Sequence, residues 1–472
     1  MNEQSGKSIV ISYEKKAQKT AQNAFFYGGN TMTGKEISEM QTKYVLQGWS
    51  KQGGLNPTPV DHCEGIYIYD KDGKRYADMS SEQVNVNAGY ANKEMTEAIK
   101  AQLDEYAYIQ GSFGAEPRAL LAKSIVDRLP DCFGKIFFTN GGADANENAI
   151  KIARMYTGRF KVMSQYRSYH GSTFGAGNLT GEPRHFALEP AIPGFIHFRG
   201  PYSYQEKIKF ASEEEEGDYY VEKLREQVIF EGGDRIAAII LETVVGSNGI
   251  IIYPKNYLKG VRKICDEFGI MMICDEVMAG WYRTGKMFAY MNFDVVPDII
   301  TFAKGVNSGY IPLGGAIVKN EIAHFFDDKY LSCGLTYSGH PLACAAGVAC
   351  QEFYLKNDIE GHVQKVGKHL GEVLESLKAK HKSVGDVRYI GLFGGVELVK
   401  DRATREPLVP WGQDPAGVMG AIVKELKARG FVTYSHENVI IVAPPLIITE
   451  AQIDEELAKL DEVLSIVDEK YI

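Results

Sequence analysis

Two stretches of this sequence, IMMICDEVMAGWYRTG at 270–285 and PDIITFAKGVNSG at 297–309, decide the fold. Each contains a short apolar run, Ile270–Cys274 and Ile299–Ala303, of the kind that forms a buried strand in a parallel sheet. A charged residue follows each run, Asp275 after the first and Lys304 after the second. Because ligands of open α/β sheets lie at the carboxyl ends of the strands, we expect this carboxylate and this amine to meet at one edge of the sheet.

The pair of Asp275 and Lys304 has the chemistry of a pyridoxal phosphate site. A lysine in a partly dry pocket loses its proton readily and can form a Schiff base with an aldehyde. A nearby carboxylate can keep a pyridine nitrogen protonated, which makes the ring an electron sink. A lone lysine after a strand is more often a solvated loop residue, and the presence of Asp275 strengthens the case for a cofactor only modestly.

Longer motifs around these residues resemble the signature of the class III aminotransferases. The matching segments are DEVMAGWYRTG at 275–285 and FAKGVNSGYIPLGG at 302–315, and the resemblance extends from about Asn56 to Leu446. It implies a fold type I pyridoxal phosphate enzyme, an α/β protein with a mostly parallel sheet of the seven-stranded type in a large domain and a smaller α/β domain. It also implies that Lys304 holds the cofactor and moves the proton, while Asp275 keeps the ring nitrogen protonated.

The length of the chain favours more than one domain. At 472 residues it exceeds the size at which single cores stop growing. We predict an N-terminal arm with the start of the small domain at 1–75, a large cofactor-binding domain at 76–345 and a C-terminal small domain at 346–472. Residues 1–30 are typical of a loose arm or a subunit-crossing segment. Residues 178–233 are predicted to be an insertion with less order, in which Glu213–Glu216 is a solvated surface run.

Composition restricts the classes of partner. The net charge of −9 leaves no basic footprint for nucleic acid. The N-terminus lacks the apolar core of a signal peptide and no apolar run approaches the length of a membrane span, so we expect a cytoplasmic protein without a membrane partner. The 7 cysteines form no C-x-x-C pair and no zinc spacing, which favours reduced thiols and no metal site.

A strand, a glycine turn and a helix follow one another in KIFFTNGGADANENAIKIARMYTG at 135–158. Backbone N–H groups at such a helix start attract phosphate, although a glycine at a tight turn is common and is weak evidence alone. The resemblance implies that Gly142 and Ala143 belong to the phosphate cradle. Ala143 stands where the family usually has a hydroxyl residue, so one side-chain hydrogen bond to phosphate is lost.

The resemblance implies four further cofactor contacts. Tyr169, in a Tyr-His-Gly triplet, would stack on the pyridine ring, and Val277 would pack on the opposite face. Glu242 would lie near the catalytic end of the cofactor. Thr336 would reach across a dimer to the partner's phosphate. We therefore expect a homodimer with shared active sites, with a tetramer as the alternative.

Two residues are candidates for contact with the substrate. Trp49 lies in a stretch that covers the substrate pocket in the family, although a core or interface role is the commoner fate of a tryptophan. Many family members have a carboxylate-binding arginine just before the last strand. Here the segment Tyr434–Asn438 contains no arginine and His436 stands nearest that place, where a plain surface histidine is the alternative. Arg167, where the family often has an arginine, is a candidate substrate anchor, but a structural ion pair is the favoured interpretation.

The resemblance predicts an aminotransferase with a ping-pong mechanism. The pattern is most similar to enzymes that act on taurine and other ω-amino acids, with 2-oxoglutarate or pyruvate as the amino acceptor. The alternatives are a β-alanine, GABA or diamine aminotransferase, a pyridoxal phosphate racemase or mutase that needs no keto acid, and a non-catalytic α/β binding protein. An NAD enzyme of the Rossmann type is poorly supported, because NGGADANE lacks the G-x-G-x-x-G spacing.

Overall fold

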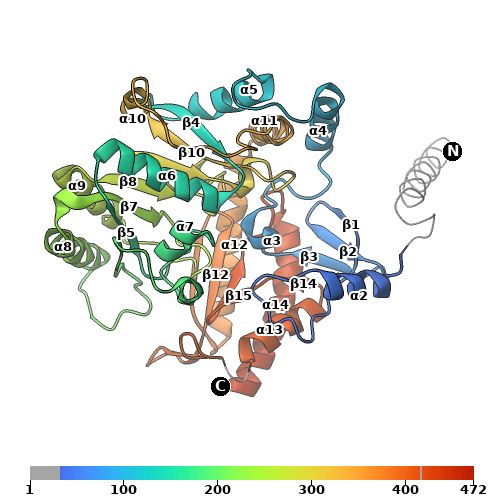
Figure 1. Ribbon diagram of the computed structural model, residues 1–472. Helices are drawn as coiled ribbons and strands as arrows, with labels where there is room; N and C mark the ends of the chain where they lie inside the picture. The colour runs from blue at the N-terminus through green and yellow to red at the C-terminus, as the bar shows by residue number, and fades with distance from the viewer. Residues whose placement is uncertain (1–31, 415–416) are drawn as a thin grey trace. The chain divides into compact units, whose positions relative to one another are not determined.

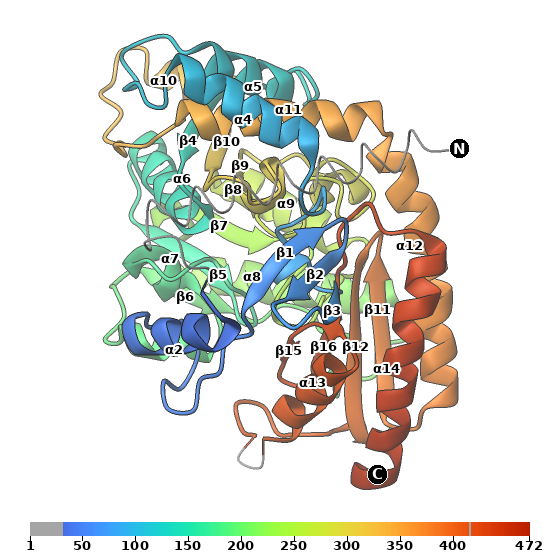
Figure 2. The same ribbon diagram turned by 90° about the vertical axis from the view of Figure 1, so that its right-hand side faces the viewer.

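The computed structural model describes residues 32–414 and 417–472 (Figures 1 and 2). Contacts within the chain divide it into two units, which comprise residues 1–63 with 68–75 and residues 64–67 with 76–472. The predicted arm at 1–30 lies outside the described residues. The predicted domain boundary between 345 and 346 falls within helix α11 (Pro341–Lys356) and stays a prediction.

The first unit contains helix α2 (Gly34–Tyr44) and most of strands β1 (Val60–Glu64) and β2 (Tyr67–Asp70). Thr33 begins α2 with a capping box, in which Thr33 and Glu36 each accept a hydrogen bond from the backbone N–H of the other. A turn that contains Asp72 and Gly73 follows β2. The N–H of Asp70 closes that turn by donating to the carbonyl oxygen of Lys74 at 3.1 Å.

The second unit is built on a seven-stranded sheet, which confirms the predicted fold class. In spatial order its strands are β4 (Phe133–Thr139), β10 (Gly314–Lys319), β9 (Ile299–Phe302), β8 (Met271–Asp275), β7 (Ile236–Glu242), β5 (Lys161–Gln165) and β6 (Phe195–Phe198). All neighbouring pairs are parallel except the two that β10 makes with β4 and β9. The expected mostly parallel sheet is therefore present.

The central strands are buried on both faces because successive residues pack into two different hydrophobic clusters. In β8, Met272 and Cys274 belong to one cluster, whereas Ile273 between them belongs to the other. Helix α9 (Tyr257–Phe268) contributes its apolar face to the first cluster, and helix α6 (Gly142–Thr157) contributes to the second (Figure 1). A sheet covered on both faces leaves its strand ends as the place for a site.

The segment 178–233 is more ordered than the sequence indicated. It contains the 3₁₀ helix η1 (Pro183–Leu188), the edge strand β6 and the 19-residue helix α8 (Glu213–Glu231). The acidic run Glu213–Glu216 is the first turn of α8, where Ser212 caps the helix and negative charge is favourable. Glu216 is buried, so the prediction of a wholly solvated run was wrong.

A second sheet in the same unit has the order β11-β12-β16-β15, with β13 paired to β12. Its strands are β11 (Val384–Ile390), β12 (Phe393–Asp401), β13 (Glu406–Pro407), β15 (Ser435–His436) and β16 (Val439–Val442). Helix α12 (Ile359–Lys380) packs on this sheet and against α14 (Glu450–Tyr471) (Figure 2). Gly391, which has a φ of 58°, lies in the turn of the hairpin formed by β11 and β12.

The remaining elements complete the described part of the chain. They are β3 (Arg75–Asp78), α3 (Ser81–Val84), α4 (Lys93–Glu105), α5 (Glu116–Val126), α7 (Phe174–Leu179), η2 (Gly233–Arg235), η3 (Ala289–Asn292), η4 (Lys304–Val306), α10 (Asn320–Phe325), α13 (Val418–Ala428) and β14 (Phe431–Val432). Among the described residues, none of the helices combines the length and apolarity that a bilayer crossing requires.

Candidate active site

Three neighbouring strands deliver polar residues to one edge of the main sheet. Glu242 ends β7 and Asp275 ends β8, and these two residues are paired in register. Asp275 is in turn paired with Thr301 of β9, and Lys304 follows that strand directly. The structure thus brings Asp275, Glu242 and Lys304 to the carboxyl ends of adjacent strands.

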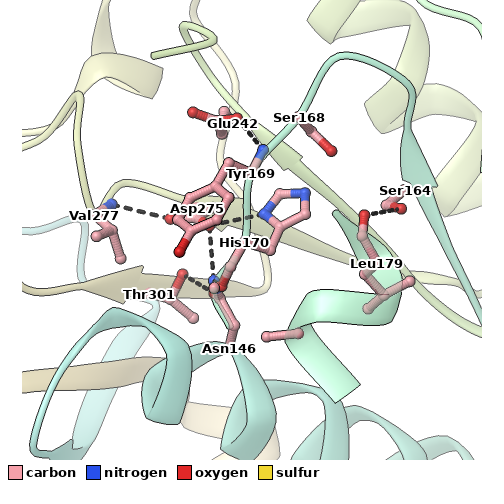
Figure 3. Close-up of polar contacts among 12 residues, drawn as sticks. Asn146, Ser164, Ser168, Tyr169, His170, Leu179, Glu242, Asp275, Val277 and Thr301 are labelled. Carbon is pink, nitrogen blue, oxygen red and sulfur yellow. Dashed lines mark hydrogen bonds and ion pairs between the residues drawn. The ribbon is translucent and has the colours of Figure 1, made fainter. Parts of the chain in front are cut away.

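Asp275 is held by a buried hydrogen-bond network (Figure 3). Its Oδ2 accepts a hydrogen bond from Asn146 Nδ2 at 2.7 Å and lies 2.8 Å from Nδ1 of His170. A carboxylate can only accept, so His170 carries its hydrogen on Nδ1. Asn146 also donates to the carbonyl of His170 at 2.7 Å and accepts from Thr301 Oγ1 at 2.7 Å. The network fixes the carboxylate so that Oδ1, which accepts from Val277 N at 3.1 Å, is its less engaged oxygen.

Lys304 has the character of a lysine that can act as a base. Burial is the main cause that lowers the pKa of its amine to about 8, and the charges of Asp275 and Glu242 partly oppose this shift. Its Nζ donates a hydrogen bond to the carbonyl oxygen of Gln83 at 3.0 Å. Lys304 is also a non-glycine residue with a φ of 50°, a conformation that clusters at functional sites.

The predicted stacking residue Tyr169 is attached to Glu242 through its backbone. Its N–H donates to Glu242 Oε1 at 2.9 Å, and Oε2 of Glu242 accepts from the N–H of Gly246 at 2.8 Å. Burial raises the pKa of Glu242 to about 7. The guanidinium carbon of Arg184 lies 4.0 Å from the centre of the Tyr169 ring, within the range of a cation–π contact.

The start of helix α6 suits a phosphate group. Gly141 is the N-cap of α6 and no side chain caps this end, so the first backbone N–H groups need another partner. A Cβ atom added to Gly142 would lie 2.7 Å from Cγ1 of Val277, so a side chain at position 142 would collide with Val277. Lys304, Asp275 with its buried network, and this uncapped helix start together fit pyridoxal phosphate.

A small polar cavity of about 70 Å³ lies in the same unit and is lined by Arg167, Trp411 and His436, among others. The guanidinium carbon of Arg167 lies 3.9 Å from the ring centre of Trp411 and 4.8 Å from that of Tyr202. No described residue forms an ion pair with Arg167, so the predicted structural ion pair is not present in the described chain. Glu397 and Glu437 also line the cavity, and their charges partly oppose the lowering of the Arg167 pKa by burial.

His436 faces this cavity as a neutral base rather than as a cation. Burial is the main cause that lowers its pKa to about 4, and the charges of Arg184 and Arg167 add to the effect. Its Nε2 is buried and has no hydrogen-bond partner among the described residues. The sequence predicted His436 as a substrate contact; the residue is half-buried, and its role stays a prediction.

The described part of the chain does not test the predicted roles of two other candidates, Thr336 and Trp49. Thr336 is in an exposed loop before α11, and its carbonyl accepts a hydrogen bond from the hydroxyl of Tyr108 at 2.7 Å. Trp49 belongs to the first unit and its side chain is 63% exposed. The reach of Thr336 into a partner site and the contact of Trp49 with substrate stay predictions.

Sequence reasoning missed several residues that the structure brings to the site: Asn146, Thr301, Arg184 and Gln83. A usable signal existed only for Asn146. It lies one helical turn after Gly142, on the same face of the helix that starts at the strand ends. Arg184 and Gln83 come from segments whose path the sequence pattern does not reveal.

Comparison with known proteins agrees with this geometry. The family model "Aminotransferase class-III" matches residues 50–464. A taurine–pyruvate aminotransferase from Bilophila wadsworthia is 33% identical over 454 residues, which cover 92% of this chain and 98% of that protein. A putrescine–pyruvate aminotransferase from Pseudomonas aeruginosa is 32% identical over 410 residues, which cover 84% of this chain and 88% of that protein.

A solved structure adds a match at higher identity. The crystal structure of a taurine:2-oxoglutarate aminotransferase from Bifidobacterium kashiwanohense, in complex with pyridoxal phosphate and glutamate, has a TM-score of 0.92 and 49% sequence identity. The match covers 94% of this chain and 100% of that chain. From the family match and these relatives it follows that this chain belongs to the class III aminotransferases, which depend on pyridoxal phosphate.

Proposed function

We propose that this aminotransferase takes its amino group from taurine and transfers it to 2-oxoglutarate. The observation that carries the proposal is Arg167, a cation that has no ion-pair partner in the described chain and lines a polar cavity with Trp411 and His436. Taurine has a sulfonate and 2-oxoglutarate a distal carboxylate, and both need a cation at a distance from the reacting carbon. Similarity to two taurine aminotransferases, at 49% and 33% identity, supports the same substrate.

In this proposal the residues of the chain have separate tasks. Bound pyridoxal phosphate supplies the electron sink for the carbon that loses its proton. The amine of Lys304 takes that proton as a general base and returns it as a general acid, which its lowered pKa of about 8 permits near neutral pH. Asp275 keeps a proton on the ring nitrogen, while Asn146 and His170 hold the carboxylate in place.

The substrate and cofactor contacts complete the proposal. Tyr169 and Val277 hold the two faces of the ring, and Gly142 and Ala143 bind the phosphate through backbone N–H groups. Arg167 binds the sulfonate of the donor and then the distal carboxylate of the acceptor, so one cation serves both half-reactions. The proposal includes a homodimer in which Thr336 completes the partner's phosphate site, and a monomeric enzyme in light scattering would contradict that part.

The test compares amino donors and acceptors in the purified enzyme. Taurine, β-alanine, GABA and putrescine are each assayed with 2-oxoglutarate and with pyruvate, and sulfoacetaldehyde is measured as the product of taurine. We expect taurine with 2-oxoglutarate to give the highest kcat/KM. Turnover of putrescine or GABA without turnover of taurine would reject the donor and keep the aminotransferase. Faster turnover with pyruvate would reject the acceptor.

A variant of Arg167 tests the role of the cavity. Arg167→Met should raise the KM for taurine and for 2-oxoglutarate about 30-fold, since a lost charge-assisted hydrogen bond corresponds to ~2 kcal/mol. The rate with putrescine and pyruvate, neither of which has a distal acid group, should change little. Arg199→Met is the matched control, because Arg199 is 70% exposed and pairs with Glu206. An unchanged KM for taurine in Arg167→Met would refute the role of the arginine.

A further inference from the structure

Four consecutive residues near Lys304 have a left-handed backbone. Ser81, Glu82, Gln83 and Val84, which form α3, have φ values of 48°, 45°, 66° and 59°. None of them is glycine, and for other residues this conformation costs roughly 1–2 kcal/mol each. Such strain persists only where surrounding contacts enforce it, and it is concentrated at functional sites.

The turn presents one carbonyl group to the lysine. Gln83 O accepts a hydrogen bond from Lys304 Nζ at 3.0 Å. A carbonyl oxygen can only accept, so one N–H of the amine is fixed and the lone pair of the neutral amine is directed elsewhere. When the amine takes up a proton, the same carbonyl stabilises the ammonium group, because a hydrogen bond to a charged donor favours the charged form.

A buried arginine holds the turn from the interior. Arg283 is 0% exposed, and its Nη2 donates to Ser81 Oγ at 3.1 Å and to Asn87 Oδ1 at 2.8 Å. Its Nη1 donates to the carbonyl oxygens of Leu392 at 2.8 Å and Pro444 at 2.5 Å. All four acceptors are neutral. Burial without a carboxylate partner is costly for a cation and lowers the pKa of Arg283 to about 9.

Three further hydrogen bonds fix the turn at its start. Asp78 Oδ1 accepts hydrogen bonds from the N–H groups of Ser80 at 3.0 Å and Glu82 at 3.2 Å. Ser81 Oγ donates to the carbonyl of Ala443 at 2.7 Å while it accepts from Arg283. In this set of contacts, Arg283 therefore bonds directly to the turn through one group, the hydroxyl of Ser81.

We propose that Arg283 is a positioning residue for the catalytic lysine: by holding the left-handed turn Ser81–Val84, it keeps the Gln83 carbonyl against the Lys304 amine. The inference rests on the catalytic role of Lys304 in the proposed function. A purely structural arginine would join the same segments without any effect on the lysine. The two roles differ in what they predict for the Lys304 amine itself.

The test measures the pKa of the Lys304 amine in the full-length enzyme loaded with pyridoxamine phosphate, in which the cofactor has no aldehyde to react with the lysine. The rate of acetylation of Lys304 by acetic anhydride is followed against pH by peptide mass spectrometry. Ser81→Ala removes the hydroxyl but leaves the charged groups that act on Lys304, which are Asp275, Glu242, Arg184 and Arg283. Arg283→Lys keeps the charge but cannot make all four hydrogen bonds.

We expect the pKa of Lys304 to fall by about 1 unit in both variants, the size of one lost hydrogen bond to a charged group. The low-pH limb of the kcat profile should move in the same direction. Arg262→Lys is the control, because Arg262 is also largely buried but bonds to Asp298 at 2.7 Å, at the opposite end of the strands. It should lower stability and leave the pKa of Lys304 unchanged.

A wild-type pKa of Lys304 in folded Ser81→Ala protein would overturn the proposal, even if stability falls. Ser81→Ala decides the matter alone if Arg283→Lys does not fold. The readout does not require that Lys304 be catalytic. Persistent turnover by a Lys304→Ala variant would instead refute the proposed function. The failure of the proposed function can therefore be distinguished from the failure of the positioning role of Arg283.

Discussion

The substitution Asn146→Asp tests the network that holds Asp275. Nδ2 of Asn146 lies 2.7 Å from Asp275 Oδ2 and 2.7 Å from the carbonyl oxygen of His170. An ionised aspartate puts an oxygen at that place, so in this form two hydrogen bonds become contacts between acceptors. The hydrogen bond from Thr301 Oγ1 to the remaining oxygen can persist, and the change in volume is small. The variant therefore changes charge and hydrogen bonding more than packing.

The repulsion can be estimated from the distance. Two unit charges 2.7 Å apart interact by ~6 kcal/mol at an effective dielectric constant of 20. This exceeds about 4 pKa units, so the new carboxyl group and Asp275 share one proton at neutral pH. A half-neutralised Asp275 holds the proton on the ring nitrogen less well. If slightly less than half of this repulsion energy is added to the activation free energy, kcat falls by about 100-fold.

Stability should depend on pH in a definite direction. The shared proton means that one folded-state pKa lies above its unfolded value of about 3.9. The folded variant then binds more protons than the unfolded chain, so its stability declines as pH rises through the raised pKa. The difference in Tm between wild type and variant should accordingly be larger at pH 8.5 than at pH 5.5.

The assays are thermal unfolding at these two pH values and kcat with taurine and 2-oxoglutarate. Asn148→Asp is the matched control, because Asn148 is on the same helix, is 3% exposed and bonds to the carbonyl of Asp144 at 2.7 Å. It introduces a buried carboxyl group without a bond to Asp275, and kcat should stay within several-fold of wild type. A wild-type kcat in Asn146→Asp, with no pH dependence of the Tm difference, would refute the reasoning.

Two further predictions concern the cofactor and the stability of the fold. Gly142→Ala should weaken pyridoxal phosphate binding about tenfold or more, since the added Cβ would lie 2.7 Å from Val277 Cγ1, whereas Gly141→Ala meets nothing within 4 Å and should bind normally in a fluorescence titration. Burial tends to raise the pKa of Asp468, but hydrogen bonds from Ser383 and His381 outweigh it and lower the pKa. The ionised Asp468 therefore stabilises the fold above its unfolded pKa, and this stabilisation is lost as pH falls. The Tm of Asp468→Asn should be lower than that of wild type at pH 7 and should converge with it near pH 3. Curves of Tm against pH that run parallel for the two proteins would contradict this.

Regular elements were predictable where a local pattern and a stop signal coincide. Helix α9 (Tyr257–Phe268) is an example, because its apolar residues follow one face and Gly269 ends it in a left-handed conformation. The segment 178–233 was not predictable in the same way. Helix α8 buries only part of a short apolar stripe and begins with four acidic residues, so its pattern resembles a solvated loop until Ser212 is recognised as its cap.

The site was predictable to the extent that strand ends determine it. Asp275 and Lys304 each follow a buried run, so the parallel sheet alone brings them to one edge. Arg167 shows the limit of this reasoning. Its position along the chain does not reveal whether a carboxylate or an aromatic ring meets it, and the structure has Trp411 and Tyr202 there. Contacts between residues so far apart in sequence depend on how the loops pack.

The turn Ser81–Val84 could not be predicted, and its physics explains why. Every one of its four residues is disfavoured in the left-handed region, so local propensity points away from the observed structure. Distant residues contact the turn: Arg283, some 200 residues later in the chain, donates a hydrogen bond to Ser81 Oγ, and the carbonyl of Ala443 accepts one from it. A place where long-range contacts override every local preference is where a functional constraint is expected. That the overridden segment ends in a hydrogen bond to the Lys304 amine is therefore an argument for its role in catalysis rather than an accident of folding.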